Sequence, residues 1–483
     1  MVFCCILRLL PLAKPVRINA HRYVFLTRPE MESILKTGST SRRHFLRAAS
    51  GSAIALGGLP KVQGESVRTP KAKSVILIFN SGAPSHIDLW DPKPLASDNI
   101  RGLFHPIDTQ VPGVQISELL PQMAARADRL AIVRSVYHSH TAHNSGMHWS
   151  IVGRPYRIDN TLINPSRSDY PCLGTLVGWL TRREAARLEG LRGTVPPYVI
   201  TPFPHCDSLV YLTPGQFGGC LGPTFDPLVL NADPNAADYR VPELGLNESL
   251  TRTRYDERRE LLQKFEVAGL PLNSPGTQSL ATFRQSVYEL LEAPAARDAF
   301  DLSKEPAAVR DRYGRHSWGQ SHLLARRLIE AGTRFVTTVN GPSIVWDTHK
   351  DNFNGLQNRL VPPMEQAYAA LLDDLAERGL LDSTLVVWMG DFGRTPIINA
   401  DAGRDHWPGC YSMVLAGGGI RGGQVVGSSD STGAAPQTRP ITPADIHATI
   451  FAALGYAPDS ATYYTADGRP TPLTEGKPIT ELL

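Results

Sequence analysis

The segment GDFGRTPIINADAGRDHWP (390–408) places acidic, basic and imidazole side chains within nineteen positions. Asp391 and His406 carry groups that ligate metals, and Arg394 carries a guanidinium that can hold a sulfate or phosphate through two hydrogen bonds. Each also has an ordinary interpretation, because Arg394 can pair with Asp391 and His406 can pack beside its neighbouring tryptophan. The segment is therefore either a polar loop or one wall of a site for a metal and an anion.

A second segment, NGPSIVWDTHKDNF (340–353), carries Asp347 and His349. The D-x-H spacing can place a carboxylate and an imidazole on the same side of an extended loop. With His406 they make a two-histidine, one-carboxylate set, which suits zinc, manganese or iron. A lone D-x-H is more often surface hydrogen bonding, so the metal hypothesis depends on whether the fold brings the three residues together.

Two more polar clusters occur in the chain, NSGAPSHIDLWD (80–91) and HSHTAHNSGMHW (138–149). The first can be a simple turn, and the histidines of the second can be loop residues whose hydrogen bonds are satisfied. Lys350 and Arg154 are further candidates for anion binding. The glycines of LAGGGIRGG (415–423) lack the context of a G-x-G-x-x-G motif, so no nucleotide site is predicted.

Continuous apolar runs and helical spacing predict the elements that must position these residues. Strands are expected over 74–79, 129–136, 334–340, 384–390 and 411–419, and helices over 321–332, 365–379 and 443–455. Strands that alternate with helices predict an α/β fold with a mostly parallel sheet. Ligands bind beyond the carboxyl ends of such strands, and the polar clusters follow predicted strands.

The middle of the chain differs in pattern. Residues 155–250 hold many prolines, glycines and asparagines with weak periodicity, and residues 252–300 look helical and charged. We expect about 155–300 to be an inserted loop and helix region over the rim of the sheet.

The composition excludes several classes of protein. The chain has 483 residues, of which 42% are hydrophobic, so it is long enough for one large domain or two ordinary ones. With 49 basic and 46 acidic residues, nothing indicates a nucleic-acid surface. Its 6 cysteines form no CxxC pair, which argues against a disulfide scaffold and against a cysteine-type zinc site.

The N-terminal region has the layout of an export signal. SRRHFLR (41–47) and the small-residue apolar run 48–60 are typical of a twin-arginine signal, and the run is shorter than the roughly 20 residues of a spanning helix. We expect residues 1–30 to be an extension of the gene model, Met31 the true start, 31–71 the signal region and linker, and 72–483 the domain. The twin-arginine translocase would then deliver a protein without a transmembrane anchor to the periplasm or another extracytoplasmic space.

Six ordered motifs resemble the bacterial domain-of-unknown-function family 1501, over about residues 41–456. They are SGAPSHIDLWDPKP, LLARRLIEAGTRFV, WDTHKDNF, LLDDLAERGLLDSTLVVWMGDFGRTP, GRDHWP and VLAGGGIRGGQVVGSSD. Members of that family resemble sulfatases and commonly carry twin-arginine signals. The resemblance implies an alkaline-phosphatase-like fold, a three-layer sandwich with a mostly parallel central sheet. Enzymes of that fold hydrolyse or transfer phosphate and sulfate esters, many of them with two metals and a covalent nucleophile.

Carried over residue by residue, the resemblance implies one retained metal site and one eroded site. The retained ligands would be Asp347, His349 and His406. In the eroded site Asp391 matches an aspartate, but Phe392 replaces the expected histidine and Asn80 replaces an aspartate. The nucleophile position falls on His143, and the hydroxyls near it in the motifs are those of Thr141, Ser145 and Ser85.

Two functions from different classes follow. The leading hypothesis is an exported, metal-dependent hydrolase of sulfate or phosphate esters, such as those of polysaccharides. A divalent metal (zinc, manganese, calcium or magnesium) would be held by Asp347, His349 and His406, with Asp391 a further ligand, Arg394 the anion clamp, and His140 or His143 the acid/base. The alternative is a non-catalytic envelope protein that binds an anionic glycan or another anion through the same site. A purely structural envelope protein would bind no metal.

Overall fold

The computed structural model describes residues 16–17, 23–24, 71–185, 195–207, 211–241, 252–267, 293–341 and 343–483. The twin-arginine motif and the apolar run after it lie outside these residues. The chain divides into two compact units, Met1–Arg68 and Thr69–Leu483, and the described part of the first is the antiparallel pair β1 (Val16–Arg17) and β2 (Tyr23–Val24). Within the described ranges, no helix combines the length and the apolar character needed to cross a membrane.

The second unit is built on an eight-stranded sheet with the order β10-β7-β11-β3-β12-β15-β6-β16. Neighbouring strands are parallel, except that β15 is antiparallel to both β12 and β6. The prediction of an α/β fold with a mostly parallel central sheet is confirmed. In the sheet order, the strands are β10 (Leu228–Val229), β7 (Tyr198–Thr201), β11 (Phe335–Asn340), β3 (Ser74–Asn80), β12 (Thr384–Gly390), β15 (Tyr411–Gly417), β6 (Leu130–Val136) and β16 (Gln424–Val426).

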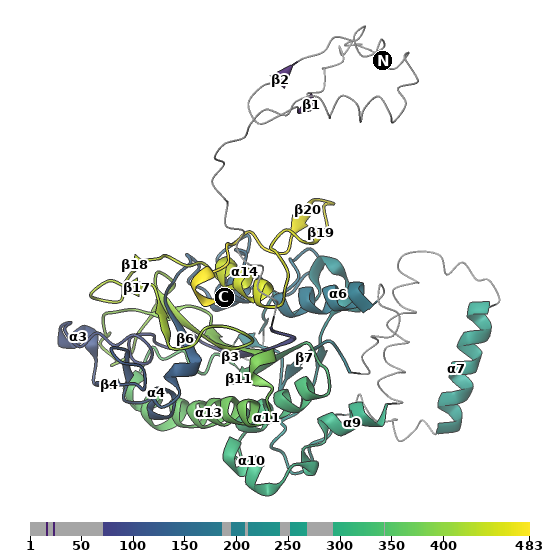
Figure 1. The fold of residues 1–483 in the computed structure, drawn as a ribbon, viewed down its shortest axis with the longest axis horizontal. Helices are drawn as coiled ribbons and strands as arrows, with labels where there is room; N and C mark the ends of the chain where they lie inside the picture. The colour runs from purple at the N-terminus through teal and green to yellow at the C-terminus, as the bar shows by residue number, and fades with distance from the viewer. Residues whose placement is uncertain are drawn as a thin grey trace, which may run out of the picture. The chain divides into compact units, whose positions relative to one another are not determined.

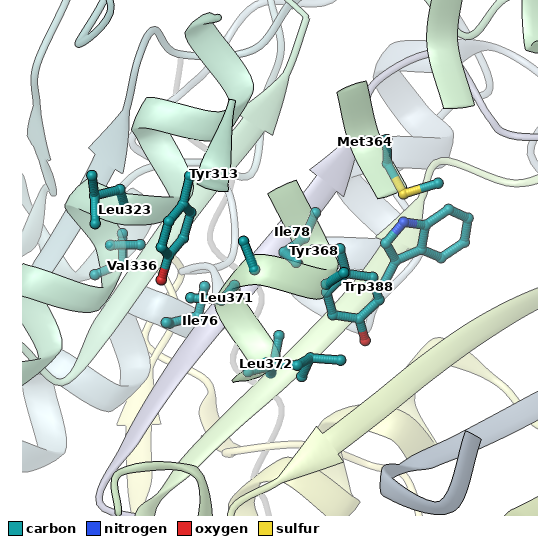
Figure 2. Packing of buried hydrophobic residues seen from close by; sticks show 14 of the residues in the cluster. Ile76, Ile78, Tyr313, Leu323, Val336, Met364, Tyr368, Leu371, Leu372 and Trp388 are labelled. Atoms are coloured by element: carbon teal, nitrogen blue, oxygen red, sulfur yellow. The ribbon is translucent and has the colours of Figure 1, made fainter. Parts of the chain in front are cut away.

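Helices cover both faces of the sheet, which makes the three layers of the sandwich (Figure 1). Successive side chains of a strand point to opposite faces, so the buried strands supply two cores. On one face Ile76 and Ile78 of β3 and Trp388 of β12 pack with α11 (Ser317–Glu330) and α13 (Val361–Glu377). Figure 2 shows Tyr368, Leu371 and Leu372 of α13 in this core.

The other face is covered by α5 (His143–Val152), α6 (Leu173–Ala185) and α14 (Pro443–Ala453). Val75 and Leu77 of β3 pack there with Met147 of α5 and Ile446 of α14. The predicted helices over 321–332, 365–379 and 443–455 are therefore present. The first two begin earlier than the apolar pattern suggested, at Ser317 and Val361.

The region from 155 to 300 contributes to the sheet as well as covering it. Its strands β7 and β10 extend the sheet beyond β11 in parallel register. This differs from the expectation of a loop and helix insertion over the rim, because these strands have only 4 and 2 residues and carry no readable period. The same region contains α7 (Arg252–Val267) and α9 (Pro294–Phe300).

The remaining strands and α-helices are short. They are the hairpins β4 (Pro106–Asp108) with β5 (Gln115–Ser117), β8 (Cys206–Asp207) with β9 (Tyr211–Leu212), β13 (Gly393–Arg394) with β14 (His406–Trp407), β17 (Ser428–Ser429) with β18 (Pro436–Thr438) and β19 (Thr462–Tyr464) with β20 (Pro470–Pro472), and the helices α3 (Asp98–Arg101), α4 (Pro121–Ala124), α10 (Ala307–Tyr313) and α12 (Asn352–Gly355). The β13–β14 pair holds Arg394 opposite His406 and so joins two parts of the opening motif.

Candidate metal site

The strand ends bring the predicted residues to one edge of the sheet. Asp347 and His349 lie in the loop after β11, Asp391 directly follows β12, and α5 begins at His143 after β6. These three strands run in the same direction, so their carboxyl ends meet at one edge. His406 precedes β15, which runs the opposite way, and it therefore lies at the same edge.

The carboxylate of Asp347 is the centre of the cluster. Its Oδ1 lies 3.1 Å from Nε2 of His349, 3.1 Å from Nε2 of His406 and 3.4 Å from Nε2 of His143. The Nε2 atoms of His349 and His406 are 3.0 Å apart. Three imidazole nitrogens from three segments of the chain thus face one carboxylate oxygen.

Each imidazole is fixed through its other ring nitrogen. In every case the partner of Nδ1 is an oxygen acceptor at 2.6 Å: Asp391 Oδ2 for His143, Asp405 Oδ1 for His349, and the Thr141 carbonyl for His406. An acceptor at Nδ1 requires that nitrogen to donate a proton, which leaves the Nε2 lone pair free. A carboxylate or carbonyl behind the ring is the usual support of a metal-ligating histidine.

His143, Asp347 and His406 form a group whose ligand atoms all lie within 4.8 Å of one another. Among the residues that the structure describes, this is the group of three histidine, cysteine or acidic residues that could hold a metal ion. The Nε2 of His143 is buried and has no hydrogen-bond partner. Nitrogen lone pairs and a carboxylate that face one another repel unless a proton or a metal cation lies between them. The donor set therefore fits a divalent metal, zinc before the oxygen-preferring magnesium and calcium.

The electrostatics of the group favour a charged Asp347 and a protonated His143 when no metal is bound. Burial opposes the charge on His143, but the carboxylates of Asp347 and Asp391 outweigh it and raise the pKa of the imidazole to about 9. Burial also opposes the charge on Asp347, yet His143, His406 and Arg394 hold the pKa of its carboxyl well below its usual range. Burial lowers the pKa of His406, which keeps that imidazole neutral and able to ligate.

Metal binding is expected to strengthen as the pH rises. The raised pKa of His143 means that this residue carries a proton on Nε2 up to about pH 9 in the metal-free protein, and a metal must displace it. Affinity should therefore increase by up to about tenfold per pH unit between pH 6 and 9. Calorimetric titration of the stripped protein with zinc at several pH values measures this slope; a flat profile would show that His143 is not a ligand.

Arg394 supports Asp347 and is not exposed to an incoming anion. Its side chain is fully buried, and its Nη2 lies 2.6 Å from Asp347 Oδ1. Its nitrogens also donate to backbone carbonyl groups, those of Ala83, Arg404, Gly82 and Trp346. This geometry favours a positioning role over the predicted clamp, because the guanidinium is committed to the protein.

The other predicted anion-binding residues lie apart from the cluster. Arg154 follows the last turn of α5, about 15 Å along the helix from His143, and it binds Glu475 and the Pro472 carbonyl. Lys350 is exposed and pairs with Asp401 at 3.2 Å.

The predicted polar candidates outside the ligand group are occupied in other ways. Asn80 is buried between Met389 and Asn340, and Ser85 accepts from the backbone N–H of Asp88. His140 packs edge-on against Trp149 at 4.7 Å.

Phe392 occupies the space beside the ligands. Its ring is 1% exposed and stacks on the His143 ring with centroids 5.0 Å apart. It also contacts the His406 ring at 4.9 Å. Where the resemblance implied a second metal site, the structure has an apolar ring and an Asp391 carboxylate that binds His143. These residues therefore suit a single metal ion.

Sequence reasoning missed one feature of this site. Asp405 was not assigned a role, although it lies directly before His406 and its carboxylate binds His349. His143, predicted as an acid/base, lies in the group whose atoms could hold a metal ion, a geometry that is compatible with either role. The signal for Asp405 was its position directly before a predicted ligand.

The fold is similar to those of several solved structures. One is a phosphonate monoester hydrolase from Silicibacter pomeroyi, with 14% identity, coverage of 84% of this chain and 76% of that chain, and a TM-score of 0.34. Another is the sulfatase PsFucS1 from Pseudoalteromonas sp., with 14% identity, coverage of 89% of this chain and 72% of that chain, and a TM-score of 0.33. A protein in the alkaline phosphatase superfamily from Vibrio parahaemolyticus also matches, with 10% identity, coverage of 82% of this chain and 73% of that chain, and a TM-score of 0.38. A search of curated proteins gave no significant match. A family model described as "Protein of unknown function (DUF1501)" matches residues 72–483, and the chain therefore belongs to this family.

Proposed function

We propose that the protein is an exported, single-metal hydrolase of sulfate or phosphate esters. The observation that carries the proposal is the convergence of three Nε2 atoms on Asp347 Oδ1, each imidazole supported from behind by an oxygen acceptor. His143, Asp347 and His406 would hold the metal. A divalent ion in this position would polarise an ester oxygen and lower the pKa of a water at the site to about 7. Export is supported by the twin-arginine pattern at residues 41–60.

His349 is the residue best placed to move a proton. Its side chain is 40% exposed, whereas His143 is 3% exposed, so substrate would approach from the side of His349. Its Nδ1 is held by Asp405 and its Nε2 faces the ligand group. An imidazole oriented in this way can take a proton from water and return it to the leaving alcohol. We assign His349 the acid/base role, and His143, Asp347 and His406 would then be the three residues that hold the ion.

Water is the attacking group in this proposal. The hydroxyls of Thr141 and Ser145 both donate to Asp159, and Ser85 accepts from the backbone. Each of these three oxygens is hydrogen-bonded to a group outside the ligand group. A covalent ester intermediate of the kind implied by the resemblance therefore has no evident nucleophile among them.

Turnover of aryl sulfate and aryl phosphate esters by the metal-loaded full-length protein tests the proposal. His406→Ala should lose both metal and activity, whereas His349→Asn should keep the metal and lose at least about 100-fold in kcat, as expected for loss of an acid/base group. Metal content of both variants, measured by mass spectrometry, separates the two effects. Metal bound without turnover of any ester would exclude the hydrolase and leave an anion-binding protein that uses the same site.

A further inference from the structure

The backbone carbonyl of Asp391 is held by two side chains that the proposed function does not use. It accepts hydrogen bonds from His138 Nε2 at 2.8 Å and from Ser150 Oγ at 3.0 Å. His138 lies in the loop between β6 and α5, and Ser150 lies on α5. The side chain of the same aspartate binds Nδ1 of His143 at 2.6 Å. Both the main chain and the side chain of Asp391 are therefore engaged in hydrogen bonds next to the metal site.

The proton of each donor is committed to this carbonyl. Nδ1 of His138 accepts the backbone N–H of His140 at 3.2 Å, so the proton of the neutral ring must lie on Nε2. Burial lowers the pKa of His138 to about 4, which keeps the ring neutral at physiological pH. The single hydroxyl proton of Ser150 goes to the carbonyl, and Tyr411, whose hydroxyl lies 3.3 Å away, then donates to Ser150. Neither donor is free to turn to another acceptor.

The two donors restrict the carbonyl more than its burial requires. Ser150 and Asp391 have no exposed surface and His138 is 5% exposed, so neither donor can reach a substrate. The ring of His138 is fixed by stacking on Trp149, with the ring centroids 5.1 Å apart. One partner is enough to satisfy a buried carbonyl. A second side-chain donor from a different part of the chain limits the position of the carbonyl further, which favours a positioning role.

We propose that His138 and Ser150 are positioning residues of the metal site and that they act through Asp391. They hold the peptide that follows Asp391, and the position of this peptide limits where the Asp391 carboxylate can lie. The carboxylate keeps a proton on His143 Nδ1 and so aims Nε2 of the same ring at Asp347. The proposal rests on the proposed function for the metal, and it adds a further layer of support behind one ligand.

Loss of this support is expected to weaken metal binding by about tenfold. Removal of a residue that directly supports a ligand costs about 10–100-fold in metal affinity. His138 and Ser150 act one residue further away, and each still holds the carbonyl when the other is removed, so the lower end of this range is expected. Metal–ligand distances tolerate deviations of only about 0.2 Å, so a small shift of the carboxylate is sufficient.

The affinity of the full-length protein for zinc, measured by competition with a fluorescent chelator, tests the proposal. Ser150→Ala and His138→Phe should each weaken zinc binding by about tenfold. His138→Gln keeps an N–H donor and should bind zinc more tightly than His138→Phe does. Unchanged affinity in both Ser150→Ala and His138→Phe would overturn the proposal.

His447→Phe is the matched control. His447 on α14 is fully buried, and its Nε2 donates to a backbone carbonyl, that of Ser150, at 2.9 Å. The substitution therefore makes the same chemical change as His138→Phe, but it removes no hydrogen bond to Asp391. Zinc affinity should stay within about twofold of the wild type. An equal loss in His447→Phe and His138→Phe would show a general effect of disturbed packing and would contradict the positioning role.

A double-mutant cycle tests whether the effect passes through the Asp391 carboxylate. Asp391→Ala removes the carboxylate and leaves the backbone carbonyl in place. In this background His138→Phe should change zinc affinity by no more than about twofold, because the route to His143 is already broken. A further tenfold loss would show that His138 acts by another route, against the proposal.

The hydrogen bond between His143 and Asp391 can also be observed without a metal. A charge-assisted bond of 2.6 Å is short, and its proton gives an NMR signal far downfield. In the metal-free full-length protein this signal should move upfield in Ser150→Ala and His138→Phe and stay in place in His447→Phe. A signal that is the same in all three variants would overturn the positioning role.

These outcomes are separable from those of the proposed function. Zinc affinity that depends on His138 and Ser150, together with no turnover of any ester, would retain the positioning residues and exclude the hydrolase. Ester turnover with a zinc affinity that ignores both residues would do the reverse. A wild type that binds no zinc would remove both.

Discussion

Asp347→Asn is expected to abolish tight metal binding and, with it, any ester hydrolysis. The substitution removes the only charged ligand of the group His143, Asp347 and His406. Loss of a residue that merely supports a ligand typically costs about 10–100-fold in metal affinity, so loss of the central carboxylate should cost at least about 100-fold. Competition of zinc against a fluorescent chelator measures the change.

Two further variants separate the loss of a metal ligand from a general loss of stability. Asp347→Asn also deprives the buried Arg394 of its carboxylate, which could destabilise the loop. His406→Ala removes a proposed ligand but keeps both side chains of the Asp347–Arg394 ion pair, and it should lose metal as well. Asp401→Asn, in the neighbouring exposed loop, breaks a surface pair with Lys350 and should bind zinc as the wild type does. Tight zinc binding by folded Asp347→Asn would contradict the assignment.

Asp88→Ala is expected to produce the largest loss of stability. Both Asp88 and Arg404 have fully buried side chains, and the guanidinium binds the carboxylate through Nε at 2.8 Å and Nη2 at 3.0 Å. Removal of one partner leaves an uncompensated buried charge, which costs about 3–5 kcal/mol of the free energy of unfolding. Urea denaturation should show this loss. Asp98→Ala, which breaks an exposed pair with Arg101 on α3, should cost less than about 1 kcal/mol.

The position of this ion pair links stability to the site. Arg404 directly precedes Asp405 and His406, and Asp88 also accepts from Asn352 in the segment after His349. Asp88→Ala should therefore weaken zinc binding as well as folding. A variant that loses no more stability than Asp98→Ala would show that Arg404 finds other partners or reaches solvent.

The strands of the core could be read from the sequence because burial on both faces leaves a continuous apolar run. β3 and β12 have this form, and β11 differs from it by two central threonines. The polar residues after these strands mark the edge where ligands bind. β7 and β10 could not be predicted in this way, since they are short strands in a segment rich in proline and glycine. Their place in the sheet is decided by the pairing of β7 with β11 and of β10 with β7, and not by local pattern.

The direction of β15 could be inferred from the connection that precedes it, although not from the strand pattern itself. A parallel connection from β12 would need a crossover of a dozen or more residues, usually a helix. The residues between β12 and β15 contain the short strands β13 and β14 and no helix, in accord with an antiparallel neighbour. This reversal places His406, which comes before β15, at the same edge as Asp347.

The site was predicted in part. Asp347, His349 and His406 converge as expected from the D-x-H motif and the polar residues at strand ends. The expectation for Arg394 could not anticipate its burial, because four carbonyl groups from three separate loops surround it. The sequence indicates which side chains can bind a metal or move a proton. Tertiary packing decides which of these side chains stabilise the site instead.

The metal content of the purified full-length protein tests the central claim most directly. After equilibration with zinc and removal of the excess, mass spectrometry should find one equivalent of metal per chain in the wild type and none in His406→Ala. Two equivalents would contradict the single site inferred from Phe392 and from the Asp391–His143 contact. No metal in the wild type would remove the site altogether.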